Sequence, residues 1–167
     1  MTAEDPFRIL LAVVAVIQTV TSLPYVSKAR AGSTIFRRRE EGLCLTGALI
    51  LFYLTYGIGF FAYLLNPSWM AWSSVEIFAT LRWFGSIPLL LGAAFMIWSL
   101  HHIGRNITIS ISTKDDHALV TSGPYRWVRH PLYTGGMVEA VGLCLLMANW
   151  FVALNAGLFW LLIAYRT

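Results

Sequence analysis

The chemistry-bearing residues of this chain concentrate in one short polar segment, residues 119–136, which lies between two strongly apolar stretches. The segment carries cationic or titratable side chains, aromatic side chains and prolines: Arg126, Arg129, His130, Tyr125, Trp127, Tyr133, Pro124 and Pro131. Ionisable groups beside hydrocarbon are costly, so a segment of this kind is typical of a functional site. We interpret it as a small-molecule site at a membrane boundary.

A helix is expected to begin inside this segment at Pro131, because proline suits the first helical turn and keeps His130 before it extended. The free N–H groups at the start of that helix attract anions, and Arg129 lies beside them. Gly135 and Gly136 leave room for a ligand against the backbone. The aromatic rings suit a planar group or a cation. An anion-binding helix end beside aromatic rings would suit an amphoteric cofactor with a carboxylate, an aromatic base and a sulfonium.

The composition predicts a membrane protein. Hydrophobic residues make up 57% of the 167 positions and charged residues 12%, whereas soluble domains contain about 25% charged residues. The net charge of +4 resides mainly in loops, so we attribute it to membrane topology and to anionic lipids, and we expect no nucleic-acid partner. Cys44 and Cys144 lie in apolar segments and are expected to be small core residues. No His/Cys spacing indicates a metal site.

The apolar segments predict an all-α integral membrane protein with five spans in a single domain, residues 1–167. The expected spans are 7–26, 43–65, 83–100, 132–147 and 151–165. The last two are separated at Ala148-Asn149-Trp150, a turn signal followed by an interfacial aromatic residue. We expect a helical hairpin there, and the alternative is one long kinked helix. A functional loop, 103–132, precedes the hairpin.

The basic residues predict the orientation of the spans. They concentrate in the first and third loops: Lys28, Arg30, Arg37, Arg38, Arg39, Arg105, Lys114, Arg126 and Arg129. The positive-inside rule places these loops and the C-terminus in the cytoplasm and the N-terminus outside. Arg8 and Arg82 are exceptions near the outer face.

The spacing Gly123-Pro124-Tyr125-x-x-x-Arg129-His130-Pro131-x-Tyr133-x-Gly135 resembles the signature of the isoprenylcysteine carboxyl methyltransferase family, whose relatives include membrane phospholipid methyltransferases. The resemblance covers about residues 100–167. It implies S-adenosylmethionine as methyl donor, bound at the cytoplasmic face under a helical hairpin. It also implies a lipophilic acceptor, such as a prenylcysteine-like carboxylate, that enters from the bilayer.

The resemblance also implies which residues bind the cofactor. These are Leu119, Val120, Gly123, Tyr125, Arg129, His130, Pro131, Tyr133 and Gly135. The family has an arginine just after the last span, which Arg166 matches, and then a pair of glutamates. Because the sequence stops at Thr167 without that pair, we expect it to be truncated.

A carboxylate acceptor is ionised at neutral pH, so its methylation requires alignment and not a strong base. Arg166 is our first candidate for binding that carboxylate, and Arg105 is the second, because a guanidinium binds a carboxylate in a bidentate manner. An amine acceptor would require a base instead, and His130 or Glu139 would then be the candidates.

Asn106 and Glu139 are the candidates for contact with the acceptor. Asn106 opens a polar stretch that either lines the substrate entrance or simply connects two spans. Glu139 lies inside an apolar span, where an acid is a functional candidate. The competing interpretation is a polar pair within the bundle, with Asn106 or a histidine as the partner.

Other function classes remain open at this point. The acceptor can be a phospholipid amine or a thiol instead of a carboxylate. The missing glutamate pair also favours a catalytically inactive membrane scaffold of the same fold. A transporter is disfavoured because the spans show no inverted repeat. The sequence does not specify the oligomeric state.

Overall fold

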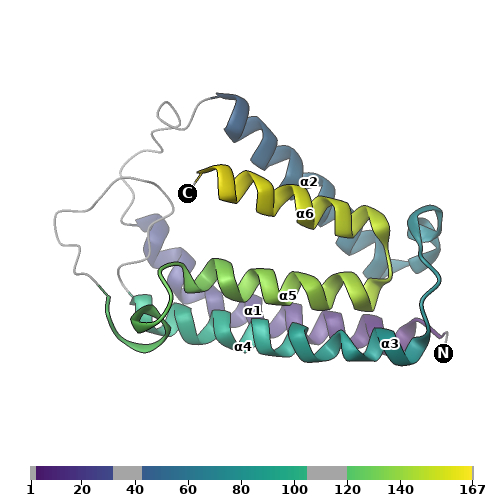
Figure 1. The fold of residues 1–167 in the computed structure, drawn as a ribbon, viewed down its shortest axis with the longest axis horizontal. Helices are drawn as coiled ribbons and strands as arrows, with labels where there is room; N and C mark the ends of the chain where they lie inside the picture. The colour runs from purple at the N-terminus through teal and green to yellow at the C-terminus, as the bar shows by residue number, and fades with distance from the viewer. Residues whose placement is uncertain (1–2, 32–42, 105–119, 167) are drawn as a thin grey trace.

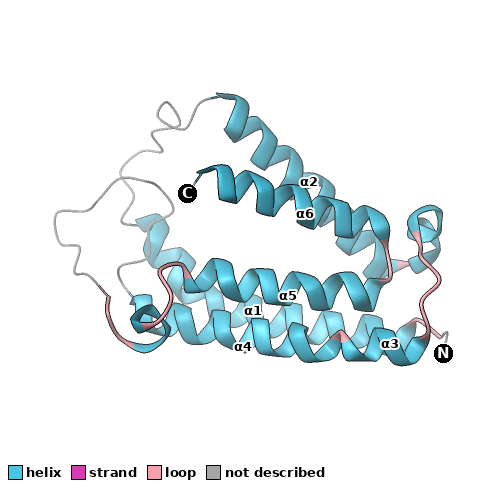
Figure 2. Cartoon of the chain, viewed as in Figure 1, coloured by secondary structure: helices cyan, strands magenta, loops and turns pink. Residues whose placement is uncertain are grey.

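The computed structural model describes residues 3–31, 43–104 and 120–166. Within these ranges the prediction of an all-helical chain is confirmed (Figure 2). The elements are α1 (Asp5–Ala31), α2 (Leu43–Leu65), η1 (Pro67–Ser73), α3 (Ala79–Phe84), α4 (Ser86–Ile103), η3 (Gly123–Arg126), α5 (Pro131–Met147) and α6 (Trp150–Arg166). Three stretches are long and apolar enough to cross a membrane, namely Asp5–Ser27, Gly47–Leu65 and Ala79–Ile103, whereas α5 and α6 are shorter apolar helices.

The helices form two groups. Helix α4 packs against α5 and α1, and α2 packs against α6. In Figure 1 the two groups approach one another at the end that holds the N-terminus and separate towards the end that holds the C-terminus. Many large apolar side chains on the outside are exposed, for example Leu51 at 63% and Leu161 at 68%. Such an apolar exterior is what a lipid environment requires.

Helices α4 and α5 are in unusually close contact because glycines lie at their interface. A Cβ atom added to Gly85 would lie 2.9 Å from the carbonyl oxygen of Gly142, and one added to Gly142 would overlap the backbone of Leu89. Gly92 similarly faces the backbone of Glu139. Small residues of this kind let two backbones approach and increase van der Waals contact, which is the main attraction between helices in lipid.

The break between α5 and α6 is held by long-range hydrogen bonds. Ala148 ends α5 in the left-handed conformation, with φ of 46°. The buried Asn149 side chain donates to the carbonyl oxygen of Met70 (3.2 Å) and to Ser73 Oγ (2.8 Å), and it accepts from Val152 N–H at 3.1 Å. The turn therefore packs on η1, so the short apolar block 131–166 consists of two helices.

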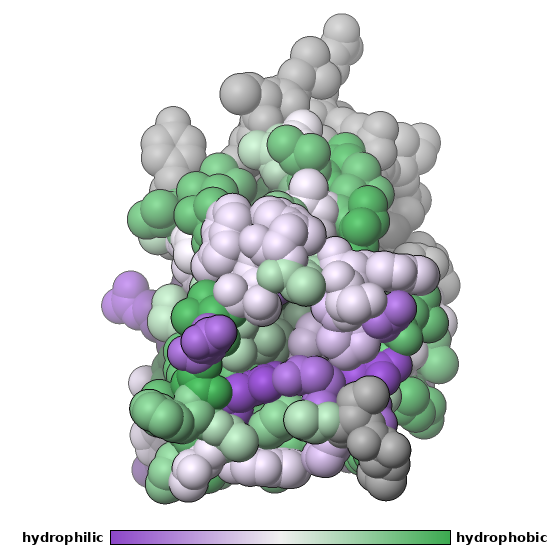
Figure 3. Space-filling model, turned by 90° about the vertical axis from the view of Figure 1, so that its right-hand side faces the viewer, coloured by the Kyte–Doolittle hydropathy of each residue, from purple (hydrophilic) through white to green (hydrophobic). Residues whose placement is uncertain are grey.

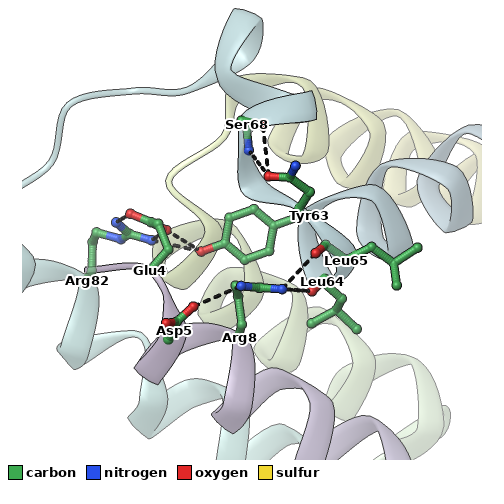
Figure 4. Close-up of polar contacts among 9 residues, drawn as sticks. Glu4, Asp5, Arg8, Tyr63, Leu64, Leu65, Ser68 and Arg82 are labelled. Atoms are coloured by element: carbon green, nitrogen blue, oxygen red, sulfur yellow. Dashed lines mark hydrogen bonds and ion pairs between the residues drawn. The ribbon is translucent and has the colours of Figure 1, made fainter. Parts of the chain in front are cut away.

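A polar cluster, which we call the clamp (Glu4, Tyr63 and Arg82), joins three segments at the N-terminal end (Figure 4). The Arg82 side chain donates to both Glu4 oxygens at 2.7 Å, to Tyr63 Oη at 3.0 Å and to the carbonyl oxygen of Leu146 at 2.6 Å. Tyr63 donates in turn to Glu4 at 2.6 Å. These bonds hold the pKa of the Glu4 carboxyl below its ordinary value.

Two arginines of this end of the bundle, Arg8 and Arg82, each have an acidic partner within the protein. Arg82 is compensated by Glu4, and Arg8 forms an ion pair with Asp5 at 2.8 Å while donating to the carbonyl oxygen of Leu64. Figure 3 shows hydrophilic surface gathered in a hollow across this end of the molecule. The hollow corresponds to a cavity of about 650 Å³ lined by Glu4, Tyr63, Arg82 and their neighbours.

We expect the substitution Gly142→Ala to destabilise the protein, because the new methyl group would force α4 and α5 apart. Overpacking of this kind costs about 1–3 kcal/mol, and the measurement is thermal unfolding in detergent. Gly57→Ala is the matched control, since a Cβ atom there meets nothing within 4 Å. Equal melting temperatures for the two variants would contradict the importance of this contact.

We expect the clamp to make stability depend on pH. Because the pKa of Glu4 is lowered in the folded state from its ordinary value of 4.5, its contribution is present above pH 4.5 and is lost as the pH falls through the folded-state pKa. Glu4→Gln should therefore lower the melting temperature at neutral pH and reduce its decline on acidification. Glu76→Gln, on an exposed side chain lining the same cavity, should retain the wild-type profile. Identical pH profiles for wild type and Glu4→Gln would contradict this role.

Candidate functional site

The polar segment of the sequence lies at the end of the bundle opposite to the clamp. We call residues 120–133 of this segment the collar. Its turn η3 packs on the end of α4, because Gly123 has φ of +59° and a Cβ atom there would lie 2.6 Å from His102 Nε2. Glycine is required at this position both for the backbone conformation and for the space beside the imidazole ring.

Aromatic contacts connect the collar to the end of α4. Trp127 is 70% exposed and its ring centroid lies 6.0 Å from that of Trp98, which in turn contacts the His102 ring at 5.7 Å. His101 Nδ1 is hydrogen-bonded to Tyr25 Oη of α1 at 2.9 Å. The adjacent histidines thus have separate partners. Within the part of the chain that the structure describes, there is no group of three or more His, Cys, Asp or Glu residues placed to hold a metal ion.

Helix α5 begins at Pro131, as the sequence predicts, and His130 precedes it with φ of −127°. The His130 ring stacks on the Tyr133 ring, with centroids 5.7 Å apart and planes inclined by 27°. Pro131 is buried, whereas Arg129 and His130 are exposed. Since proline has no N–H, the first free backbone donors of α5 belong to Leu132 and Tyr133. The start of α5 therefore has free backbone donors beside the stacked His130 and Tyr133 rings, with the exposed Arg129 adjacent in sequence.

Tyr125 has a buried hydroxyl group with no hydrogen-bond partner among the described residues. Burial raises the pKa of this phenol to about 12, so the hydroxyl stays protonated at neutral pH and remains a hydrogen-bond donor. A buried polar atom without a partner is uncommon in a native structure and is typical of a site that receives a ligand. Val120, the first described residue of the collar, is half-buried.

An apolar cavity of about 510 Å³ opens beneath the collar. Leu132 and Tyr133 belong to both features, and the rest of the lining comes from α1, α2, α4, α5 and α6, including Tyr56, Gly136, Glu139 and Trp160. The Tyr133 ring contacts the Trp160 ring edge-on at 6.5 Å. The collar and the cavity thus meet at Leu132 and Tyr133.

The two glycines of the predicted site have different surroundings. A Cβ atom added to Gly136 would lie 3.6 Å from the Trp160 ring, beside the cavity. A Cβ atom added to Gly135 would lie 2.7 Å from Met96 Cγ, within the α4–α5 contact. Gly135 therefore serves helix packing in this structure, and Gly136 is the glycine that faces the cavity.

Glu139 is hydrogen-bonded to Gln18 of α1, whose Nε2 donates to Glu139 Oε2 at 2.8 Å. The polar-pair interpretation thus holds, but the partner is an amide from the first helix and not a histidine. Both side chains line another cavity of about 310 Å³, and Glu139 also lines the 510 Å³ cavity beneath the collar. Sequence reasoning missed Gln18, although an isolated amide in an apolar segment was an available signal.

Several predicted site residues lie outside the described ranges. These are Arg105, Asn106 and Leu119. Helix α6 ends at Arg166, and in Figure 1 this end of the chain lies on the same side of the molecule as the collar. The roles predicted for these residues stay predictions.

Comparison with known proteins assigns the second half of the sequence to a family. Residues 83–167 match the isoprenylcysteine carboxyl methyltransferase (ICMT) family. The match begins at Trp83 and so includes all of α4, whereas the resemblance noted from the sequence begins at about residue 100. The matched segment contains the collar, the α4–α5 contact and α6.

Several curated relatives are named as isoprenylcysteine methyltransferases, and one has another name. Protein-S-isoprenylcysteine O-methyltransferase of Dictyostelium discoideum is 32% identical over 83 residues, which are 48% of this chain and 35% of that protein. Protein-S-isoprenylcysteine O-methyltransferase A of Arabidopsis thaliana is 35% identical over 68 residues, 40% of this chain and 34% of that protein. The cobalt-zinc-cadmium resistance protein CzcN of Cupriavidus metallidurans is 40% identical over 70 residues, 40% of this chain and 32% of that protein.

The aligned segment spans about a third of the length of each of these relatives. The residues whose spacing forms the signature, from Gly123 to Gly135, lie within the segment that matches the family, residues 83–167. The family match covers residues 83–167 of a chain of 167 residues, which is half of its length. The chain belongs to the isoprenylcysteine carboxyl methyltransferase family.

Proposed function

We propose that this chain is a membrane methyltransferase that transfers a methyl group from S-adenosylmethionine to a lipophilic acceptor, with the carboxylate of a prenylcysteine-like molecule as the preferred acceptor. Family membership and the names of the relatives support the reaction class. The observation that carries the proposal is the position of Tyr133, which belongs both to the cationic collar and to the 510 Å³ apolar cavity.

The collar residues fit the chemical groups of S-adenosylmethionine. Its carboxylate suits the free N–H groups of Leu132 and Tyr133 together with Arg129, because helix starts and guanidinium groups bind anions. Its planar base suits stacking on an aromatic ring such as the His130–Tyr133 pair. The Tyr125 hydroxyl, which has no partner among the residues that the structure describes, offers a further hydrogen bond. Val120, Gly123 and Pro131 would shape the backbone around the group, and Leu119 is proposed to join them.

When bound, S-adenosylmethionine supplies a methyl group activated by its sulfonium. The protein then has to orient the acceptor, exclude water and hold the acceptor carboxylate, and such positioning contributes several kcal/mol, with an upper range of about 7–11 kcal/mol. Arg166 at the end of α6 is the residue proposed to bind the acceptor carboxylate, with Arg105 as the second candidate. The mainly apolar lining of the cavity would favour a lipophilic acceptor over water in the region beneath Tyr133.

We propose that the chain crosses the membrane five times, with α3 and α4 acting as one span and α5 and α6 as a hairpin. Seventeen residues in α5 correspond to about 26 Å of helix. This is slightly less than the hydrocarbon thickness of about 30 Å, so the hairpin should tilt or thin the bilayer locally. The collar and the C-terminus would face the cytoplasm and the N-terminus the outside.

A second acceptor class is favoured by one observation. Glu139 places a carboxyl group in the wall of the cavity, where it is available as a base for an amine. Amine methylation requires loss of a proton, whereas carboxylate methylation does not. A phospholipid amine is therefore the alternative acceptor.

Incubation of the purified protein with radiolabelled S-adenosylmethionine tests the reaction. The protein is reconstituted in vesicles, and the acceptors are a prenylcysteine, a phospholipid amine and a lipid thiol. We expect label in the prenylcysteine as a base-labile ester. Label in the amine alone would overturn the preferred acceptor. The absence both of label and of cofactor binding would overturn the enzyme proposal and favour a scaffold.

We expect Arg129→Ala to weaken binding of S-adenosylmethionine by at least about tenfold, because a hydrogen bond to a charged group contributes about 1.5–3 kcal/mol. Arg126→Ala is the matched control, since it removes the same charge from an exposed position three residues away and should have a much smaller effect. Equilibrium binding of labelled cofactor measures both variants. Equal losses of cofactor affinity in the two variants would contradict a specific contact by Arg129, because a general effect of positive charge would explain both.

A further inference from the structure

The apolar cavity beneath the collar follows one face of α5. Its lining residues on this helix are Leu132, Tyr133, Gly136, Glu139, Ala140 and Leu143. They recur at intervals of three or four positions, so they share one side of the helix. From Tyr133 to Leu143 the helix rises by about 15 Å. The cavity is therefore an elongated space that leads from the collar towards the clamp end of the bundle.

Another part of the wall comes from α2 and α6, and it is aromatic and fixed in place. The Phe52 and Phe159 rings stack, with centroids 4.3 Å apart and planes inclined by 19°. Further along, Thr55 Oγ1 donates to Asn155 Oδ1 at 2.7 Å, next in sequence to the lining residue Ala156. This bond holds α2 and α6 together at the level of Ala156, so the wall there resists moving aside for a longer ligand.

The far end of the cavity is lined by buried residues, whereas the collar end is open. Tyr133 at the collar is 37% exposed, but Leu143 and Ala156 are only 9% and 7% exposed. The two groups of helices also approach one another in this direction (Figure 1). Of the described residues that line both this cavity and the 310 Å³ cavity, Leu143 is the buried one. Leu143 thus belongs to the wall between the two spaces.

Fit decides which hydrocarbon tail such a cavity accepts. A tail that moves from the bilayer into the protein gains little from the hydrophobic effect, because both surroundings are apolar. Overpacking of a space that is already well filled is unfavourable. An isoprene unit contains four chain bonds of about 1.5 Å, which extend to about 5 Å, so about three units match a depth of about 15 Å.

We infer that Leu143 and Ala156 limit the tail of the acceptor to about three isoprene units, the length of a farnesyl group, and disfavour the longer geranylgeranyl group. This inference rests on the proposed function and specifies the tail of its acceptor. With the reacting end of the acceptor at Tyr133, a further unit would meet the buried Leu143 and Ala156 side chains. The two residues act as determinants of tail length and have no part in methyl transfer itself.

The test compares the binding of N-acetylcysteine thioethers that carry a geranyl, a farnesyl or a geranylgeranyl group to the protein in lipid nanodiscs. Each probe is present at the same mole fraction in the lipid, because longer tails partition more strongly into bilayers. Native mass spectrometry measures the bound fraction. We expect the wild-type protein to bind the farnesyl probe about tenfold more tightly than the geranylgeranyl probe, the order expected for overpacking. Equal binding of these two probes would overturn the inference.

Two variants should change the preferred length in opposite directions. Leu143→Ala removes a side chain between the far end and the 310 Å³ cavity, so the geranylgeranyl probe should bind about as tightly as the farnesyl probe. Ala156→Leu fills the far end, so binding of the farnesyl probe should fall about tenfold, whereas binding of the shorter geranyl probe should persist and report that the variant is folded. An unchanged farnesyl preference in both variants would overturn the inference.

Ala153→Leu is the matched control for Ala156→Leu. Ala153 lies on the same helix but is exposed and lines neither cavity, so this variant should keep the wild-type preference. A loss of farnesyl binding in Ala153→Leu equal to that in Ala156→Leu would attribute the effect to α6 as a whole and overturn the role of Ala156.

Probe binding does not require methyl transfer, so the two proposals fail separately. Discrimination by tail length in a protein that neither binds nor uses S-adenosylmethionine would support the length limit and overturn the proposed reaction. Methyl transfer to farnesyl and geranylgeranyl acceptors that bind equally well would support the reaction and overturn the length limit.

Discussion

The close contact between α4 and α5 is the constraint on which the rest of the structure depends. Gly85, Gly92 and Gly142 remove the side chains that would separate these two helices. Their contact determines where α5 begins relative to the end of α4, and so brings Gly123 against the His102 ring. It also places Glu139 in the wall shared by the two cavities. Packing, and not the hydrophobic effect, has to supply this attraction in a bilayer.

The two ends of the bundle differ in whether their polar groups have hydrogen-bond partners within the protein. At the clamp each nitrogen of the Arg82 guanidinium donates a hydrogen bond within the protein, to Glu4, Tyr63 or the carbonyl oxygen of Leu146. At the collar Arg129 and His130 are exposed and the Tyr125 hydroxyl has no partner among the described residues. Satisfied polar groups stabilise a fold, whereas groups left available are suited to binding. This difference supports the proposal that the collar is the end that binds a ligand.

Local features of this chain could be predicted from its sequence, and long-range pairings could not. The start of α5 at Pro131 and the bounds of α2 follow from proline chemistry and apolar length, which act within one segment. The partners Gln18 and Glu139 are 121 positions apart, and Glu4 and Arg82 are 78 apart. Hydropathy identifies such polar residues as exceptions but does not pair them, because pairing depends on how the helices pack. The sequence also does not distinguish Gly135 from Gly136, because only the packing of the helices places Gly135 against Met96 and Gly136 against Trp160.

Photolabelling with radiolabelled S-adenosylmethionine tests most directly whether the collar, at the mouth of the apolar cavity, is the reaction site. The protein in nanodiscs is irradiated with the cofactor, digested and mapped by mass spectrometry, with excess unlabelled S-adenosylhomocysteine as competitor. Our account predicts competable label within residues 120–136, the collar and the first turns of α5. Competable label confined to the clamp end, around Glu4, Tyr63 and Arg82, would contradict it.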